Sequence, residues 1–148
     1  MIGNNKTILL VEDNKNDELL AIRALKKNNV TSNIFIARDG VEAINYIFNG
    51  TADNKLPLNL PELILLDLNL PKLNGLEVLK RLKNNEATAQ IPIVMMTSST
   101  EESDIKSSYA LGANSYIRKP VDFGDFSSLI SNLATYWLVL NRSPNSFH

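Results

Sequence analysis

Residues 63–79, with the sequence LILLDLNLPKLNGLEVL, decide the fold of this chain. The segment opens with four consecutive apolar residues, turns polar at Asp67 and Asn69, and leads after Gly75 into a stretch with leucines at helical spacing. A short, continuously apolar run is typical of a strand that helices cover on both faces. A buried strand that leads into an amphipathic helix predicts a parallel α/β sheet.

The same alternation extends from this segment toward both ends of the chain. Strands are predicted at residues 7–11, 33–37, 63–67, 93–97 and 115–118. Helices are predicted at residues 16–28, 41–49, 76–83, 100–112 and 123–140. Ser99 and Glu102 have the spacing of a capping box before the fourth helix. Gly50 and Gly112 suit helix ends, and the polar, proline-bearing residues 51–61 suit a surface loop.

The composition excludes several classes of function. The 148 residues include 15 basic and 16 acidic side chains, so the net charge of -1 offers no footprint for nucleic acid or an anionic membrane. There is no cysteine, and the single histidine is His148 at the end of the chain. A Ser-His-Asp triad and a histidine or cysteine metal site therefore lack their key groups. Without a signal peptide or an apolar stretch of membrane length, the expectation is a soluble cytoplasmic protein.

Polar residues follow four of the predicted strands. Glu12 and Asp13 follow the first strand, Asp67 ends the third, Thr97 ends the fourth and Lys119 follows the fifth. In an open parallel sheet these strand ends meet at one edge, where ligands bind. Three converging carboxylates would repel one another, and a divalent cation removes that conflict; oxygen ligands alone favour Mg²⁺. One carboxylate could then act as a nucleophile toward phosphorus. Each residue taken alone would more often be a solvated charge or a cap.

Four segments in this order resemble the receiver domain of two-component response regulators. They are ILLVEDN at 8–14, LILLDLNLPKLNGLEVL at 63–79, IVMMTSS at 93–99 and GANSYIRKP at 112–120. The resemblance covers about residues 7–140 and implies a doubly wound, five-stranded parallel sheet of the flavodoxin-like (βα)5 type with strand order 2-1-3-4-5. Because only residues 141–148 follow the last predicted helix, we expect one receiver domain over residues 1–148, with no output domain.

The resemblance assigns the acceptor and the metal ligands. Asp67 matches the aspartate that is phosphorylated. Glu12 and Asp13 match the acidic pair that binds Mg²⁺ together with Asp67, and Asn69 matches the position that gives a backbone carbonyl to the metal. Mn²⁺ is expected to substitute for Mg²⁺.

The resemblance also assigns a switch. Thr97 matches the hydroxyl that moves toward the phosphoryl group, and Tyr116 matches the aromatic residue that turns inward on activation. Lys119 matches the lysine that neutralises the phosphoryl oxygens, and the bond from Lys119 to Pro120 is expected to be cis, which is accessible before proline.

The last predicted helix is the most apolar. Most of its apolar residues repeat at helical spacing and should be core, yet residues 136–140 are five apolar residues in succession. A helix that is apolar all round needs a second partner, so the region of Phe126, Leu133, Trp137 and Leu140 is a candidate homodimer interface. The YWLVLN ending and the long second loop resemble small response regulators of cyanobacterial phytochrome kinases, which implies a sensor histidine kinase, such as a phytochrome, as partner.

The expected function is that of a single-domain response regulator. It would accept a phosphoryl group from a histidine kinase on Asp67 and change conformation, and it would not be an enzyme. An aspartate-nucleophile phosphatase is disfavoured because Asn69 stands where such enzymes often have a second, acid-base aspartate. A flavodoxin-type module is disfavoured because EDNKND at 12–17 would repel a phosphate. A receiver that is never phosphorylated remains a third alternative.

Overall fold

The computed structural model describes residues 6–27, 33–48 and 59–144. They form a five-stranded parallel sheet in the order β2-β1-β3-β4-β5, so the predicted strand order is confirmed. The strands are β1 (Thr7–Val11), β2 (Asn33–Ala37), β3 (Leu63–Leu66), β4 (Ile93–Thr97) and β5 (Ser115–Arg118). The helices are α1 (Lys15–Lys27), α2 (Gly40–Phe48), α3 (Gly75–Lys83), α4 (Glu102–Ala110) and α5 (Phe123–Thr135), followed by the π-helical turn η1 (Tyr136–Leu140).

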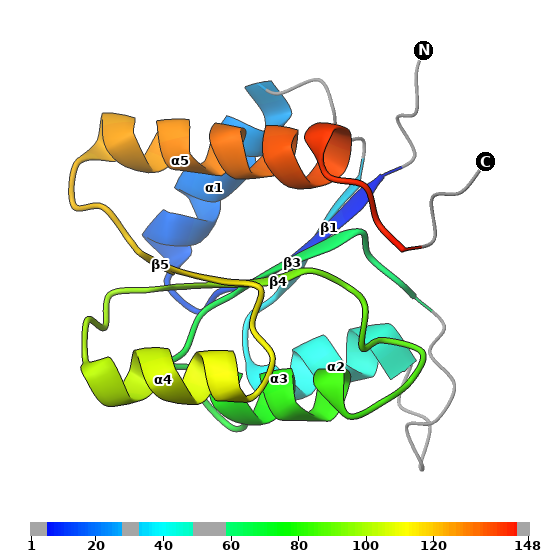
Figure 1. The fold of residues 1–148 in the computed structure, drawn as a ribbon. Coiled ribbons are helices and arrows are strands. Elements are labelled where there is room, and N and C mark those ends of the chain that lie inside the picture. Colours follow the sequence, from blue (N-terminus) through cyan, green and yellow to red (C-terminus); the bar gives the residue numbers. More distant parts are fainter. Residues whose placement is uncertain (1–5, 28–32, 49–58, 145–148) are drawn as a thin grey trace.

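The helices lie in two layers on the two faces of the sheet. Figure 1 shows α1 and α5 side by side on one face, and α2, α3 and α4 on the other. Alternate residues of a strand serve opposite faces: Leu9 and Val11 pack into the core beneath α2 and α3, while Ile8 and Leu10 pack beneath α1 and α5. Burying each such aliphatic side chain stabilises the fold by about 1.5–3 kcal/mol before conformational entropy is subtracted.

The burial of each strand matches its place in the sheet. All residues of the interior strands β3 and β4 are buried, as their continuously apolar sequences predict. The edge strand β2 alternates between exposed and partly buried residues until Ala37. The central position of β1 and β3 brings the acidic residues that follow both strands to the middle of one sheet edge.

The structure differs from the sequence predictions at the end of β3 and at the start of α4. β3 ends at Leu66, one residue earlier than predicted, although the amide of Asp67 still donates to the Val11 carbonyl at 3.1 Å. The capping box predicted before α4 is wrong. The N-cap is Glu101, and the Ser99 hydroxyl instead donates to Asp104 at 2.6 Å.

The end of α5 departs from a regular α-helix. Residues 136–140 form a π-helical turn, in which the Asn141 amide donates to the Tyr136 carbonyl at 2.7 Å. Leu138 follows the buried Ile130 and Ala134 at helical spacing and is buried as well, whereas Leu140, at the end of the π-helical turn, is 64% exposed.

The homodimer interface at this end of the chain stays a prediction, and the burial of its side chains limits which of them a partner could contact. Phe126 and Leu133 are buried in the protein's own core, on the face of α5 that packs against the sheet. They are therefore not available to a partner chain. The exposed apolar residues of the segment are Tyr136, Val139 and Leu140.

Two predictions fall outside the described residues: the helix end at Gly50 and the loop over 51–58. Within the ranges that the structure describes, no helix combines the length and the apolar character that crossing a membrane requires.

Candidate functional site

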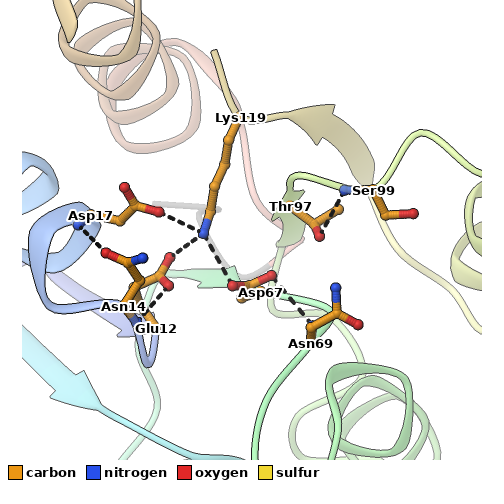
Figure 2. A network of polar contacts seen from close by, with 8 residues as sticks. All are labelled: Glu12, Asn14, Asp17, Asp67, Asn69, Thr97, Ser99 and Lys119. Atoms are coloured by element: carbon orange, nitrogen blue, oxygen red, sulfur yellow. Dashed lines mark hydrogen bonds and ion pairs between the residues drawn. The ribbon is translucent and has the colours of Figure 1, made fainter. Parts of the chain in front are cut away.

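The candidate site lies at the carboxyl ends of the strands, beside the point where the order of connections reverses. β1 pairs with β2 on one side and with β3 on the other, and β3 leads through α3 to β4. In an open parallel sheet this reversal leaves a crevice at the strand ends where ligands bind. Polar side chains from the loops after β1, β3 and β5 meet at this edge of the sheet, and Thr97 at the end of β4 lies beside them (Figure 2).

Three carboxylates meet there, as the sequence predicts. Oxygens of Glu12, Asp13 and Asp67 all lie within 4.8 Å of one another. Glu12 and Asp67 are buried, with 2% and 7% of their surface exposed, whereas Asp13 is exposed. Backbone hydrogen bonds hold Glu12 and Asp67 in place. The Glu12 amide donates to the Ala37 carbonyl at 2.9 Å, and the Asp67 amide donates to the Val11 carbonyl of β1. This set of hard oxygen donors fits Mg²⁺ or a similar cation.

The electrostatics of the cluster favour a cation. Burial raises the pKa of Glu12 from 4.5 to about 7, although the hydrogen bond and charge of Lys119 act in the opposite direction; the charge of Asp67 adds to the rise. Burying an ionised carboxylate costs free energy unless positive charge compensates it. A divalent ion would supply the compensation that Lys119 provides only in part.

Lys119 is the cation of the site. Its ammonium lies 2.7 Å from Glu12, 2.9 Å from Asp17 and 3.1 Å from Asp67, and its side chain is only 8% exposed. Burial lowers the pKa of Lys119, but the hydrogen bond to Glu12 and the charges of Asp67 and Glu12 outweigh it and hold the pKa above its usual range. Lys119 is therefore positively charged at neutral pH. Its backbone amide donates to Thr97 at 2.8 Å, which ties the base of the side chain to β4.

The predicted switch residues meet at Ser99. The Ser99 amide donates to the Thr97 hydroxyl at 3.3 Å, and the Tyr116 hydroxyl donates to the Ser99 carbonyl at 3.0 Å. Burial raises the pKa of Tyr116, so its hydroxyl stays protonated and can donate. Because Ser99 also donates to Asp104 of α4, one residue connects the site edge, β5 and α4.

Two residues of this site were not assigned from the sequence. Asp17 stands at the end of the acidic stretch 12–17, and Ser99 has the spacing of a helix cap, but neither pattern predicts a contact with the site. Asp17 lies in the first turn of α1, just after the acidic pair Glu12 and Asp13, and this closeness in the sequence is the available signal that it could reach the same edge of the sheet.

The structure also bears on the predictions for Asn69 and for the peptide bond between Lys119 and Pro120. Asn69 follows Asp67 by two residues, and its backbone amide donates to Asp67 at 3.4 Å, which puts this loop beside the carboxylates. Among the described residues no peptide bond is cis, so the cis bond expected between Lys119 and Pro120 is wrong in this structure. The trans form is intrinsically favoured by about 0.5–1 kcal/mol before proline, and Lys119 reaches its partners in that form.

The raised pKa of Glu12 predicts an unusual pH dependence of stability. In EDTA, the free energy of unfolding is expected to fall by about 1–3 kcal/mol between about pH 4.5 and about pH 7, because the folded state binds the Glu12 proton more tightly than the unfolded state does. Urea unfolding across this range measures the effect. Saturating Mg²⁺ is expected to remove most of the loss.

Glu12→Gln is the control for this experiment, because glutamine cannot ionise. Its stability should show a weaker decline over the same pH range than that of the wild type. Identical pH profiles for the two proteins would contradict the assignment of the effect to Glu12.

Comparisons with known proteins agree with this geometry. Residues 8–131 match the family described as the response regulator receiver domain. The chain is 39% identical to the probable methanogenesis regulatory protein FilR2 of Methanothrix harundinacea over 137 residues, covering 93% of this chain and 86% of the relative. It is 38% identical to the response regulator Rcp1 of Synechocystis over 133 residues, covering 90% and 89% of the two chains.

Solved structures are similar in fold and length. The Mn²⁺-bound form of Rcp1 superposes with a TM-score of 0.84 at 37% identity, covering 95% of this chain and 99% of that one. The phosphorylated cyanobacterial phytochrome response regulator RcpA gives a TM-score of 0.87 at 37% identity, with the same coverage. The similarity to small phytochrome response regulators that the sequence predicts is confirmed. The chain belongs to the response regulator receiver domain family and is a response regulator of two-component signalling.

Proposed function

We propose that Asp67 of this protein accepts a phosphoryl group from the phosphohistidine of a sensor histidine kinase. The observation that carries the proposal is the convergence of charge on Asp67. A buried carboxylate lies 3.1 Å from the Lys119 ammonium and within 4.8 Å of two further carboxylates. A site with this arrangement can hold a cation and an anionic phosphoryl group next to each other.

The chemistry is a transfer between two nucleophiles. An oxygen of Asp67 attacks the phosphorus of the donor, so that a P–O bond forms and the P–N bond to the donor histidine breaks. The imidazole leaves with the electron pair of the broken bond and takes up a proton. Lys119 places its positive charge beside the oxygens of the transferred group, and the Thr97 hydroxyl stands at the end of the neighbouring strand to donate to one of them.

Mg²⁺ would be held by Glu12, Asp13, Asp67 and the backbone carbonyl of Asn69. When bound, the ion supplies positive charge that neutralises the phosphoryl oxygens. The donor chemistry supports this assignment, and so does the similarity to Rcp1, which has been solved with Mn²⁺. Mn²⁺ is proposed as a substitute on the same ground.

The protein is proposed to transmit a signal and to catalyse no reaction on other molecules. An aspartate phosphatase would need an acid or base beside its nucleophile, and the amide of Asn69 cannot serve as either. The readout is proposed to be a shift between two conformations through Thr97, Ser99 and Tyr116, which are connected by hydrogen bonds. Partners would recognise the surface of α4, β5 and α5.

The kinase is proposed to be of the phytochrome class. The supporting observation is the similarity to RcpA, a phytochrome response regulator, over nearly the full length of both chains. A cytoplasmic location is part of the same proposal, because kinase phosphohistidines are formed from ATP. Binding to nucleic acid is not proposed, given the nearly balanced charge.

Incubation with acetyl phosphate and Mg²⁺ tests the acceptor function. Intact-mass measurement should find one added phosphoryl group, and EDTA should prevent it. Beryllofluoride with Mg²⁺ is the second arm, because some receivers do not react with small donors. The proposal fails if neither the mass adduct nor bound beryllofluoride in fluorine NMR is found.

A homodimer through η1 is the second proposal. Tyr136, Val139 and Leu140 are 50%, 52% and 64% exposed at the end of α5. Three large apolar side chains gathered in one turn are costly to leave in water. The Tyr136 ring packs edge-on against Trp137 with ring centres 5.0 Å apart, which makes the patch a fixed surface suited to self-association.

The dimer is tested by placing charge in this patch. A variant with Val139→Asp and Leu140→Asp is expected to raise the dimer dissociation constant at least about tenfold, because two carboxylates would face an apolar surface. Sedimentation velocity measures this constant. Val121→Asp is the matched control, since Val121 is 95% exposed in the loop before α5 and should leave assembly unchanged. Wild-type protein that is monomeric at high concentration, with and without beryllofluoride, would refute the interface.

A further inference from the structure

Asp17 is a third acidic partner of Lys119, outside the three-carboxylate cluster. Its carboxylate lies 2.9 Å from the ammonium, compared with 3.1 Å for Asp67. Figure 2 shows the ammonium between Asp17 and Asp67, which approach it from different directions. The position of Asp17 is fixed by the start of α1, where its amide donates to the side chain of Asn14 at 3.0 Å.

These contacts use the full capacity of Lys119. An ammonium has three N–H donors, and here three carboxylates (Glu12, Asp17 and Asp67) lie within hydrogen-bond or ion-pair distance. A phosphoryl group that arrives at Asp67 would need a donor from the same ammonium. Part of the positive charge available for that group is already balanced by Asp17.

We propose that Asp17 competes with the phosphoryl group for Lys119 and so limits the stability of the phosphorylated state. This inference rests on the proposed function of Asp67. Phosphorylation turns a singly charged carboxylate into a group that carries about two negative charges, so the demand for Lys119 increases when the phosphoryl group arrives. Asp17 is 29% exposed at its side chain and can turn toward solvent when it loses this partner.

Asp17 is not needed to hold Lys119 in place. The backbone amide of Lys119 donates a hydrogen bond to the Thr97 carbonyl at 2.8 Å, and the Lys119 ammonium is 2.7 Å from the buried carboxylate of Glu12. Because these two contacts remain when Asp17 is neutralised, the ammonium stays in the site and has one negatively charged partner fewer. Removal of Asp17 should therefore strengthen binding of an anion at Asp67.

The test is titration of the full chain with beryllofluoride at saturating Mg²⁺, followed by fluorine NMR. Asp17→Asn is expected to bind beryllofluoride about three- to tenfold more tightly than the wild type, because one competing charge beside a largely buried ammonium is removed. Asp17→Glu keeps the charge and is expected to stay within about twofold of the wild type.

Asp125→Asn is the matched control. Asp125 occupies the same position in α5 as Asp17 does in α1, with its amide donating to the side chain of Asp122 at 2.9 Å, but its side chain is exposed away from Lys119. The substitution removes the same charge and the same interaction with the helix dipole. Its affinity for beryllofluoride should equal that of the wild type.

The outcomes separate this inference from the function on which it rests. Tighter binding in Asp17→Asn alone supports the competition, since damage to the fold would weaken binding. Unchanged or weaker binding in Asp17→Asn, or equal tightening in Asp17→Glu or Asp125→Asn, overturns it while the acceptor function stands. A wild type that binds no beryllofluoride and gains no phosphoryl mass overturns both.

Discussion

Replacing Asp67 by asparagine is expected to abolish the added phosphoryl mass. The amide nitrogen and oxygen of asparagine are poor nucleophiles, so the adduct formed with acetyl phosphate and Mg²⁺ should fall at least about 100-fold. The substitution keeps the size of the side chain, and the Asn69 amide, 3.4 Å from Asp67 in the wild type, keeps an acceptor. Folding is therefore expected to be retained, and intact mass with circular dichroism measures both properties.

Asp39→Asn is the control for this variant. Asp39 is also a buried aspartate, with 6% of its surface exposed, but it caps α2 by accepting from the Glu42 amide at 2.8 Å. Asparagine caps helices about as well as aspartate, so this variant should fold and be phosphorylated like the wild type. An undiminished adduct in Asp67→Asn would show that another residue is the acceptor.

Replacing Gly75 by alanine is expected to lower the stability of the protein strongly, because the added methyl group has no room. The added carbon would lie 2.2 Å from the Asp67 carbonyl oxygen and 2.8 Å from the Leu68 Cα, and both are backbone atoms that cannot turn aside. The Gly75 amide also donates to Leu68 at 2.8 Å, which holds the start of α3 against this loop. The free energy of unfolding, measured in urea, should fall by about 2–4 kcal/mol.

Gly124→Ala is the matched control, because Gly124 also lies in the first turn of a helix. There the nearest atom to an added carbon is the end of the Asp122 side chain at 3.3 Å, which can adjust. Alanine favours helix over glycine, so the stability should stay the same or rise by up to about 1 kcal/mol. Equal effects at the two glycines would mean that the loop after β3 gives way more easily than its close packing indicates.

Gly75→Ala also connects stability with function. The carbon would press on the backbone of the residue that carries the acceptor carboxylate, so any fold that survives must move Asp67. Binding of beryllofluoride should weaken in this variant, whereas Gly124→Ala should bind as the wild type does.

The amino-acid sequence by itself determined the fold and the membership of the carboxylate cluster. The apolar runs of β1, β3 and β4 are continuous because both faces of those strands are buried, and this pattern is visible without coordinates. Polar residues placed directly after such runs must meet at one sheet edge. Glu12, Asp67 and Lys119 were found in this way.

Only the tertiary structure decided which of these groups contact one another. Lys119 and Asp17 are separated by 102 positions in the chain, and their pairing depends on how α1 starts relative to β5. The hydrophobic repeat within one helix or strand carries no information about its distance from residues of another helix or strand. The same holds for Ser99, whose contacts with Thr97, Tyr116 and Asp104 come from three different elements.

The π-helical turn at the end of α5 was likewise decided by packing. Five consecutive apolar residues carry no local signal for a π-helix, which is far rarer than the α-helix. Within this turn Leu138 packs into the core on the α1 and α5 side of the sheet, whereas Val139 and Leu140 remain exposed. Sequence thus fixes what each segment can bury, whereas the contacts between segments fix which side chains remain available for a ligand or a partner.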